Sequence, residues 1–317
     1  MPKTIDAIPP ESGGASGFSG AMSAPGLNDM KTALILVVIA FAWGLNYVVV
    51  KNVYAGITPL SYCASRFVAA GVILLLITRF TEGKAFVEKS DIFGIAALAV
   101  FGFGFSNLFM ALALKNTGAS TASMISSTAP IFAIFSAALF KIDNFSLKKT
   151  LAIMISIFGI YFIVSGRGVS GSSVSNDASM GVVYCFISAI TWAIYSVFSK
   201  RLLKKYSAVR FTANVVFISS LAMIPVAYNE LSATGWLSLP GFVYYSFIFS
   251  VFFSSVIPLI YWNRCIARTG PVTVMMSQNM VPVFALICAY FFLHEAVSSS
   301  QLMGSFVVIC SILLGTL

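Results

Sequence analysis

Apolar residues occur along this chain in a series of long runs that are separated by short polar segments. Runs such as Leu34–Ala42 are continuously apolar rather than alternating, which favours membrane helices over the strands of a membrane barrel. Crossing about 30 Å of hydrocarbon takes roughly 20 helical residues. The candidate spans are 32–51, 58–78, 92–114, 119–140, 149–165, 180–199, 210–228, 242–263, 271–293 and 301–317, of which the fifth and the tenth are short. The pattern predicts an all-α membrane protein with ten transmembrane helices.

Composition agrees with a polytopic membrane protein. Of 317 residues, 59% are apolar and 9% are charged, whereas roughly 25% are charged in an ordinary soluble domain. These values argue against a cytosolic enzyme and a secreted disulfide scaffold. The five cysteines form no CxxC pair, and each lies in or beside an apolar run. We expect them to be small buried residues rather than disulfides or metal ligands.

Residues 1–30 differ from the rest of the chain. They are rich in Gly, Ser, Ala and Pro and contain no apolar run, so they predict a disordered tail rather than a signal peptide. With this tail inside the cell, all but four of the 19 Lys and Arg residues fall on the cytoplasmic side. The exceptions are Lys51, Lys115 and Arg167 outside and Arg66 within a span.

This asymmetry follows the positive-inside rule, and it predicts that both termini are cytoplasmic. We expect the protein in a bacterial inner (plasma) membrane. The net charge of +9 then reflects topology, and no nucleic acid is expected as a partner.

The two halves of the chain resemble each other. Phe41–Lys51 matches Ile190–Lys200, and Thr117–Ser146 aligns without a gap to Thr269–Ser298 at an offset of 152 residues. Each half holds five predicted spans, and an odd number reverses the second half in the membrane. The sequence therefore predicts two inverted five-helix repeats, residues 31–168 and 178–317. Such repeats suit alternating access, although a duplication kept only for packing would give the same pattern.

Several motifs carry a family resemblance. They are Trp43-Gly44-x-Asn46, Lys51 at the end of the first span, Pro59 followed by Arg66-Phe67, the run ALKNTGASTASMISSTAP ending at Pro130, and its second-half counterpart ending FFLHE at Glu295. With these motifs in this order, the chain resembles the drug/metabolite transporter superfamily, specifically its EamA-type transporters. The usual Gly-Glu that closes the fourth span reads Ile142-Asp143 here. The resemblance implies that spans 1, 3, 4, 6, 8 and 9 surround a central cavity, with the others outside them, and it suggests export.

Two prolines occupy equivalent positions in the fourth and ninth spans. Pro130 and Pro282 each lack an N–H, so each frees a carbonyl four residues earlier, at Ser126 and Gln278. A free carbonyl in lipid needs a partner or a wet cavity. We expect the two kinks to face a substrate cavity that is lined by Ser123, Ser127, Gln278 and Asn279. Capping of these carbonyls by nearby Ser hydroxyls is the alternative.

Aromatic and amide side chains add to this candidate site. Trp43 and Asn46 lie on the first span, and Trp192 and Tyr195 lie at the matching positions of the sixth. Aromatic faces with a few amides suit a small amphipathic solute, whereas interfacial anchoring or packing would use the same residues. Asn107 in the third span predicts either a ligand contact or a helix–helix hydrogen bond.

Three basic residues are further candidates. Arg66 is the one charge deep in a span, where it could take a carboxylate or cap loop carbonyls and helix ends. Lys51 and Lys115 are predicted at the outer mouth, where they would attract anions or extend toward the interface.

Other function classes are disfavoured. All ten Asp and Glu lie in the tail, in loops or at span ends, so a proton relay through a buried carboxylate is not expected. An embedded enzyme would need a nucleophile and base or a metal cluster, and a channel would need repeated pore rings. We expect no catalytic residue, metal or cofactor.

The predicted function is transport of amino acids or related zwitterionic or amphipathic metabolites. The alternative is an exchanger or uniporter of phosphorylated or nucleotide-type metabolites. The expected partners are a small-molecule substrate and the lipid bilayer, and the expected state is a monomer or a weak homodimer.

Overall fold

A computed structural model describes residues 27–54, 56–116, 122, 125–143, 146–165, 178–293 and 297–316. Within these residues the regular structure is helical, as the apolar runs predict. The N-terminal half contains α1 (Leu27–Val53), α2 (Pro59–Glu82), α3 (Ile92–Ala97), η1 (Leu98–Gly104), α4 (Phe105–Asn116), α6 (Ala129–Leu139) and α7 (Leu147–Ser165). The C-terminal half contains α8 (Ala178–Leu202), α9 (Ala208–Ala233), η2 (Trp236–Ser238), α10 (Gly241–Phe249), η3 (Ser250–Val256), α11 (Ile257–Thr269), α12 (Pro271–Ser277), η4 (Gln278–Met280), α13 (Val281–Leu293) and α14 (Ser299–Thr316).

Seven helical segments of the described residues are long and apolar enough to cross a membrane, and two further apolar helices are shorter. An all-helical membrane protein is therefore confirmed, whereas ten crossings stay a prediction. The predicted tail lies almost wholly outside the described residues. The predicted fourth span includes positions outside them too, and its described helix α6 covers 11 residues.

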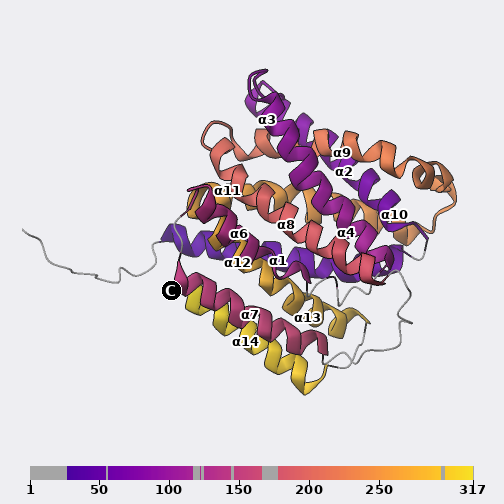
Figure 1. The fold of residues 1–317 in the computed structure, drawn as a ribbon. Helices are drawn as coiled ribbons and strands as arrows, with labels where there is room; N and C mark the ends of the chain where they lie inside the picture. Colours follow the sequence, from indigo (N-terminus) through magenta and orange to yellow (C-terminus); the bar gives the residue numbers. More distant parts are fainter. Residues whose placement is uncertain are drawn as a thin grey trace, which may run out of the picture.

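Helix pairs from the two halves make up much of the packing. α2 packs along α9, α7 along α14, α1 against α13, and α8 against both α4 and α6. Figure 1 shows α7 and α14 side by side along the lower edge, with α2 and α9 toward the opposite edge. α1, α8 and α12 lie between these two pairs.

Two large buried apolar clusters form most of the core of the described residues. One gathers residues of α2, η1, α9 and α11, and the other gathers residues of α1, α6, α8, α11 and α12. Trp43 and Trp192 pack against both clusters. These two side chains therefore stand where the halves of the core meet.

In the part of the chain that the structure describes, each half contains one π-helical segment of seven residues, η1 and η3. They begin at Leu98 and Ser250, which are separated by the same 152 residues as the sequence repeat. π-helical turns are rare, and those that occur are often found at functional sites. Both segments are largely buried, so their irregular backbone is kept inside the protein.

Small residues bring α7 and α14 into close backbone contact. A Cβ added to Gly159 would lie 2.8 Å from the carbonyl oxygen of Gly304 and 3.0 Å from the amide nitrogen of Val308. Close approach through small residues is a usual means of helix association in lipid, where apolar side chains gain little by leaving the solvent.

This contact predicts the effect of adding one methyl group. Gly304→Ala should lower the free energy of unfolding by about 1–3 kcal/mol, because the new Cβ meets backbone atoms rather than a flexible side chain. Unfolding of the purified protein in detergent would measure the loss. Gly94→Ala is the matched control, since nothing lies within 4 Å of its Cβ, and it should not destabilise. Equal stability of the two variants would contradict the packing account.

Candidate functional site

Three tryptophans from three helices meet at the centre of the fold. The ring centroids of Trp43 on α1 and Trp262 on α11 are 5.0 Å apart. Trp192 on α8 lies 6.1 Å from Trp43 and 5.8 Å from Trp262. These distances are typical of aromatic pairs, each of which adds about 0.5–1.5 kcal/mol beyond its burial. We call Trp43, Trp192 and Trp262 the tryptophan cluster.

Other rings extend the cluster toward α2. Phe103 of η1 lies 6.2 Å from Trp192 and 5.4 Å from Tyr195. Phe67 of α2 lies 5.1 Å from Phe103. A continuous row of aromatic contacts therefore runs from the tryptophan cluster to α2.

The indole N–H groups of the cluster are used differently. Trp43 donates to the backbone oxygen of Ser254 in η3 at 3.0 Å. Trp192 donates to Oε1 of Gln278 at 2.8 Å. Trp262 Nε1 is buried and has no hydrogen-bond partner among the described residues. Two indoles thus bind residues of the irregular segments η3 and η4, one at a backbone oxygen and one at a side chain, and the third donor is not used by a described residue.

The two prolines that were predicted to kink their spans both lie where a helix begins again after an interruption. Pro130 is in the first turn of α6, which follows a turn at Ser127 and Thr128. Pro282 is in the first turn of α13, which follows the 3₁₀ turn η4. The first turn is where proline is tolerated, since the N–H that it lacks would have no helical partner. Both prolines are buried, so each interruption lies inside the protein.

The polar residues expected beside the prolines take separate positions. Gln278 reaches the tryptophan cluster through Trp192, whereas Asn279 donates to Ser156 Oγ on α7 at 3.0 Å. Ser127 is buried. Ser123 lies outside the described residues. The Ser126 hydroxyl donates to the carbonyl of Ala122 at 2.8 Å, within its own segment.

Of the remaining residues predicted for the site, one lies at the site and two form hydrogen bonds elsewhere in the fold. Asn46 accepts from Ser250 Oγ of η3 at 2.6 Å, one turn from Trp43 on the same helix. Asn107 donates to Phe103 O of its own segment at 2.9 Å. Tyr195 is fully buried, and its hydroxyl accepts from Asn263 at 2.8 Å. Asn46 therefore lies beside the tryptophan cluster, whereas the side chains of Asn107 and Tyr195 form hydrogen bonds with other residues of the fold.

The sequence prediction left out several residues of this site. Trp262, near the end of the predicted span 242–263, is not among the predicted site residues, yet it completes the tryptophan cluster. Ser250 and Ser254 were not considered, because serines are frequent in the chain and no local pattern marks those of η3 as contacts of Asn46 and Trp43.

The three basic candidates have different surroundings. Lys115 forms an ion pair with Glu230 at 3.1 Å. The Lys51 side chain lies outside the described part of the chain. Arg66 makes no hydrogen bond or ion pair within the described residues, and its guanidinium carbon lies 4.5 Å from the centroid of the Phe67 ring. Within the described residues, Arg66 is thus left without an oxygen partner, whereas Lys115 has one.

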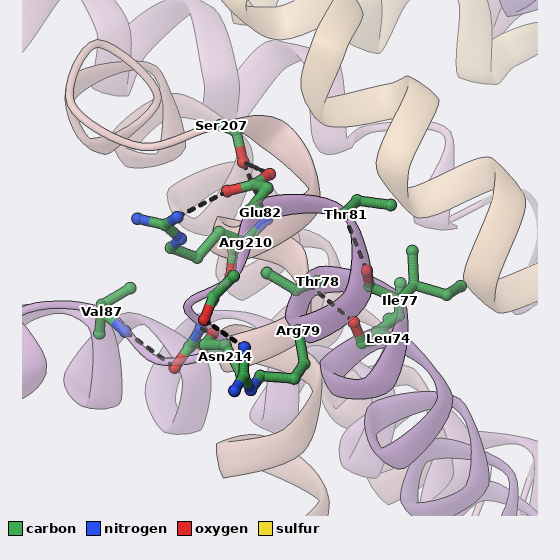
Figure 2. Close-up of polar contacts among 12 residues, drawn as sticks. Leu74, Ile77, Thr78, Arg79, Thr81, Glu82, Val87, Ser207, Arg210 and Asn214 are labelled. Atoms are coloured by element: carbon green, nitrogen blue, oxygen red, sulfur yellow. Dashed lines mark hydrogen bonds and ion pairs between the residues drawn. The ribbon is translucent and has the colours of Figure 1, made fainter.

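Polar contacts fasten α2 to α9 at one end of the pair. Figure 2 shows Glu82, at the end of α2, between Ser207 and Arg210. The Ser207 hydroxyl donates to Glu82 Oε1 while it accepts from the backbone N–H of Arg210 as the cap of α9. Arg210 Nη2 lies 2.9 Å from Glu82 Oε2.

An equivalent arrangement fastens the opposite end. The Thr58 hydroxyl caps α2 by accepting from the backbone N–H of Ser61, and it donates to Glu230 near the end of α9. Glu230 also pairs with Lys115. At each end, a capping hydroxyl of one helix therefore binds a carboxylate of the other. We call these two contacts the carboxylate latches.

The loops beside the first latch carry a further ion-pair group. Lys205 Nζ lies 2.7 Å from Glu88 Oε2 and 2.6 Å from Asp91 Oδ2. Hydrogen bonds from Lys205 and Tyr206 lower the pKa of Asp91, and the same contact with Asp91 raises the pKa of Lys205. This group links the loop after α2 to the loop before α9.

The latch geometry predicts unequal effects for two carboxylates. Glu82→Gln should lower the free energy of unfolding by about 1 kcal/mol, since the partly buried pair with Arg210 is lost. Glu88→Gln is the control. Its side chain is 64% exposed, so the change should stay below about 0.5 kcal/mol. Unfolding in detergent measures both, and a larger loss for Glu88→Gln would count against the latch.

Comparisons with known proteins agree with this architecture. The model of the EamA-like transporter family matches residues 30–165 and again residues 179–317. A solved crystal structure superposes with a TM-score of 0.75 at 13% sequence identity, over 90% of this chain and 96% of that chain, which shows a shared fold.

Several curated relatives are similar over nearly their full length. An uncharacterized transporter of Archaeoglobus fulgidus is 25% identical, over 89% of this chain and 98% of its own. The uncharacterized transporter YyaM of Bacillus subtilis is 25% identical, over 90% and 94%. The uncharacterized inner membrane transporter YedA of Escherichia coli K12 is 23% identical, over 87% of both chains. Because the family model covers both halves, this chain, an integral membrane protein, belongs to the EamA-like transporter family.

Proposed function

We propose that this protein transports small metabolites, namely amino acids or related zwitterionic or amphipathic solutes, by alternating access between two inverted five-helix repeats. Its direction is export. The observation that carries the proposal is the antiparallel pairing of helices that occupy the same place in the two halves.

Two such pairs support the inversion. The start of α2 meets the end of α9 and the start of α9 meets the end of α2, through Thr58 with Glu230 and Ser207 with Glu82. In the second pair, a Cβ on Gly315, late in α14, would lie 2.8 Å from Cβ of Ala152, early in α7. Equivalent helices that run in opposite directions are what a reversed second repeat requires.

The contacts between other helices support the same relation. If the halves exchange places, α1 corresponds to α8, α4 to α11 and α6 to α13. The packing of α1 on α13 then corresponds to that of α8 on α6, and α1 on α11 to α8 on α4. The contacts of α2 with η3 and α4 likewise have counterparts in those of α9 with η1 and α11. Halves that pack alike can exchange conformations at little cost in free energy.

The tryptophan cluster is the proposed substrate site. The aromatic faces of Trp43 and Trp192 would take the apolar part of a solute, and the amides of Asn46 and Gln278 would take its polar groups. The three rings contact one another in this structure, so a solute must part them. The hydrogen bond between Trp192 and Gln278 is the contact that a polar group of the solute would replace.

The interrupted helices supply the proposed moving parts. The breaks before Pro130 and Pro282 remove local backbone hydrogen bonds. The π-helical segments η1 and η3 interrupt two other spans, between α3 and α4 and between α10 and α11. A helix bends more easily at such points than along an unbroken stretch. The carboxylate latches and the glycine contact hold the outer pairs together while the centre opens.

The orientation in the membrane is part of the proposal. With ten crossings both termini lie on the same side of the membrane, and the excess of Lys and Arg in the loops of that side makes it the cytoplasm. In this orientation the Glu82 latch lies on the cytoplasmic side and the Glu230 latch outside. A bacterial inner membrane is the proposed location, and one similar protein is named as an inner membrane transporter. The proposed working unit is a monomer or a weak homodimer.

Counterflow in proteoliposomes tests the transport function. Vesicles preloaded with an unlabelled amino acid should take up the same labelled amino acid faster than empty vesicles, because alternating access exchanges bound solutes. A set that spans apolar, aromatic and polar amino acids would define the class. If none of them shows trans-stimulation, the proposed substrate class is wrong.

Proline variants test the interrupted helices. Pro130→Ala combined with Pro282→Ala should slow exchange about tenfold or more and change the unfolding temperature little, since straighter helices resist bending. Pro225→Ala is the control, because Pro225 lies exposed within α9 and away from both interruptions. An unchanged exchange rate in the double variant would remove these breaks from the mechanism.

A further inference from the structure

Arg66 is a charged side chain within an apolar span. It lies seven residues into α2, which is about 10 Å along the helix at 1.5 Å per residue. Its guanidinium carbon lies 4.5 Å from the centroid of Phe67 and 5.8 Å from that of Tyr62. Its Nε is buried and without a hydrogen-bond partner, and no described residue bonds its other nitrogens.

This environment is costly for a cation. An arginine within a membrane span is expected to pair with an anion, with carbonyl oxygens or with water in a cavity. Aromatic rings satisfy part of the charge, but they accept none of its five N–H groups in the way that an oxygen does. Arg66 therefore holds unused donors that suit an anionic group.

Other arginines of the chain show the contrast. Arg79 donates to the carbonyl of Gly83 at 2.6 Å, and Arg201 donates to that of Phe140 at 2.7 Å. Arg210 pairs with Glu82. These residues cap a helix end or close a contact between helices, which was the structural role considered for Arg66. Arg66 has no such contact within the described residues.

Two rows of side chains connect Arg66 to the tryptophan cluster. Phe67, on which the guanidinium lies, contacts Phe103, and Phe103 contacts Trp192. A polar row runs beside them, because Tyr62 interacts with the Ser250 hydroxyl and Ser250 donates to Asn46. A solute that lies along these rows can place an anionic end at Arg66 and an apolar end at the cluster.

We propose that Arg66 is a substrate-binding residue that takes the carboxylate of the transported solute. Its two terminal nitrogens can bind both carboxylate oxygens, a geometry that arginine provides and lysine does not. The aromatic row then takes the apolar part of the same molecule. This inference rests on the proposed function and narrows the substrate class to carboxylates, zwitterionic amino acids included.

A binding measurement on the purified protein tests the inference apart from transport. Benzoate is the probe, since its ring suits the aromatic row and its carboxylate suits Arg66. Tryptophan fluorescence should report its binding, because three of the four tryptophans form the cluster. Arg66→Gln should raise the Kd for benzoate about tenfold or more, as loss of a hydrogen bond to a charged group predicts. Arg66→Lys should give an intermediate value.

Matched probes and variants separate the explanations. Benzyl alcohol, which has the ring without the charge, should bind the wild type and Arg66→Gln equally. Arg264→Gln should leave the Kd for benzoate unchanged, because Arg264 also lies near a ring, 5.1 Å from the centroid of Tyr261, but is exposed on α11. Size-exclusion profiles and unfolding temperatures identify any variant that has lost its fold, and Arg66→Lys then carries the test.

The outcomes are distinct. Absence of benzoate binding to the wild type, or equal binding to Arg66→Gln, overturns the inference. Phenyl phosphate that binds much more tightly than benzoate overturns the carboxylate assignment. Competition by phosphatidylglycerol in nanodiscs would show that a lipid headgroup occupies Arg66. Arg66-dependent benzoate binding without amino acid counterflow would sustain the inference and refute the proposed function.

Discussion

The lipid interior offers no hydrogen bonds to the backbone, and this constraint organises the whole structure. Each peptide group in the apolar spans must find its partner within its own helix or inside the protein. The regular helices meet this condition along their lengths. The irregular segments η1 and η3 are largely buried, and Asn279 of η4 is buried, so neighbouring side chains can reach them. Ser254 in η3, for example, accepts the hydrogen bond of Trp43.

Because irregular backbone is kept inside, the polar groups that could recognise a solute gather there as well. Gln278 of η4 accepts a hydrogen bond from Trp192 in its own half, and Ser250 of η3 donates one to Asn46 in the other half. The central contacts are mostly between aromatic rings, and each is modest in free energy. Such contacts can part and re-form at less cost than a network of buried ion pairs.

The outer helix pairs are joined differently. α7 and α14 approach through glycines, with little space between their backbones. α2 and α9 are fastened at both ends by a capping hydroxyl and a carboxylate. In both pairs, atoms with little conformational freedom are in contact, so a displacement would break several interactions at once. The fold therefore combines closely joined outer helix pairs with a centre whose contacts are mainly between aromatic rings.

Much of the fold could be predicted from local sequence. Long apolar runs predict helices because backbone groups in lipid must be satisfied, and Pro130 and Pro282 indicate interruptions because proline has no N–H. The tryptophan cluster could be predicted only in part from the sequence. Trp43 and Trp192 stood out through the internal repeat, whereas Trp262 has no tryptophan at its repeat-equivalent position, Met110. The hydrogen-bond partners of Asn107 and Tyr195 could not be predicted either, because they depend on which side chains the packing brings near.

By itself the sequence determined the membrane class, the helical content and the two-fold pattern of the chain, because each follows from hydrophobicity and spacing along one dimension. Tertiary structure alone decided which basic residue is paired. Lys115 and Arg66 are both basic residues in or beside apolar runs. Lys115 pairs with Glu230, 115 positions away, whereas Arg66 contacts aromatic rings and no oxygen of a described residue. The physical reason is that charge pairing depends on distance in space, and residues far apart in sequence become neighbours only when the helices pack.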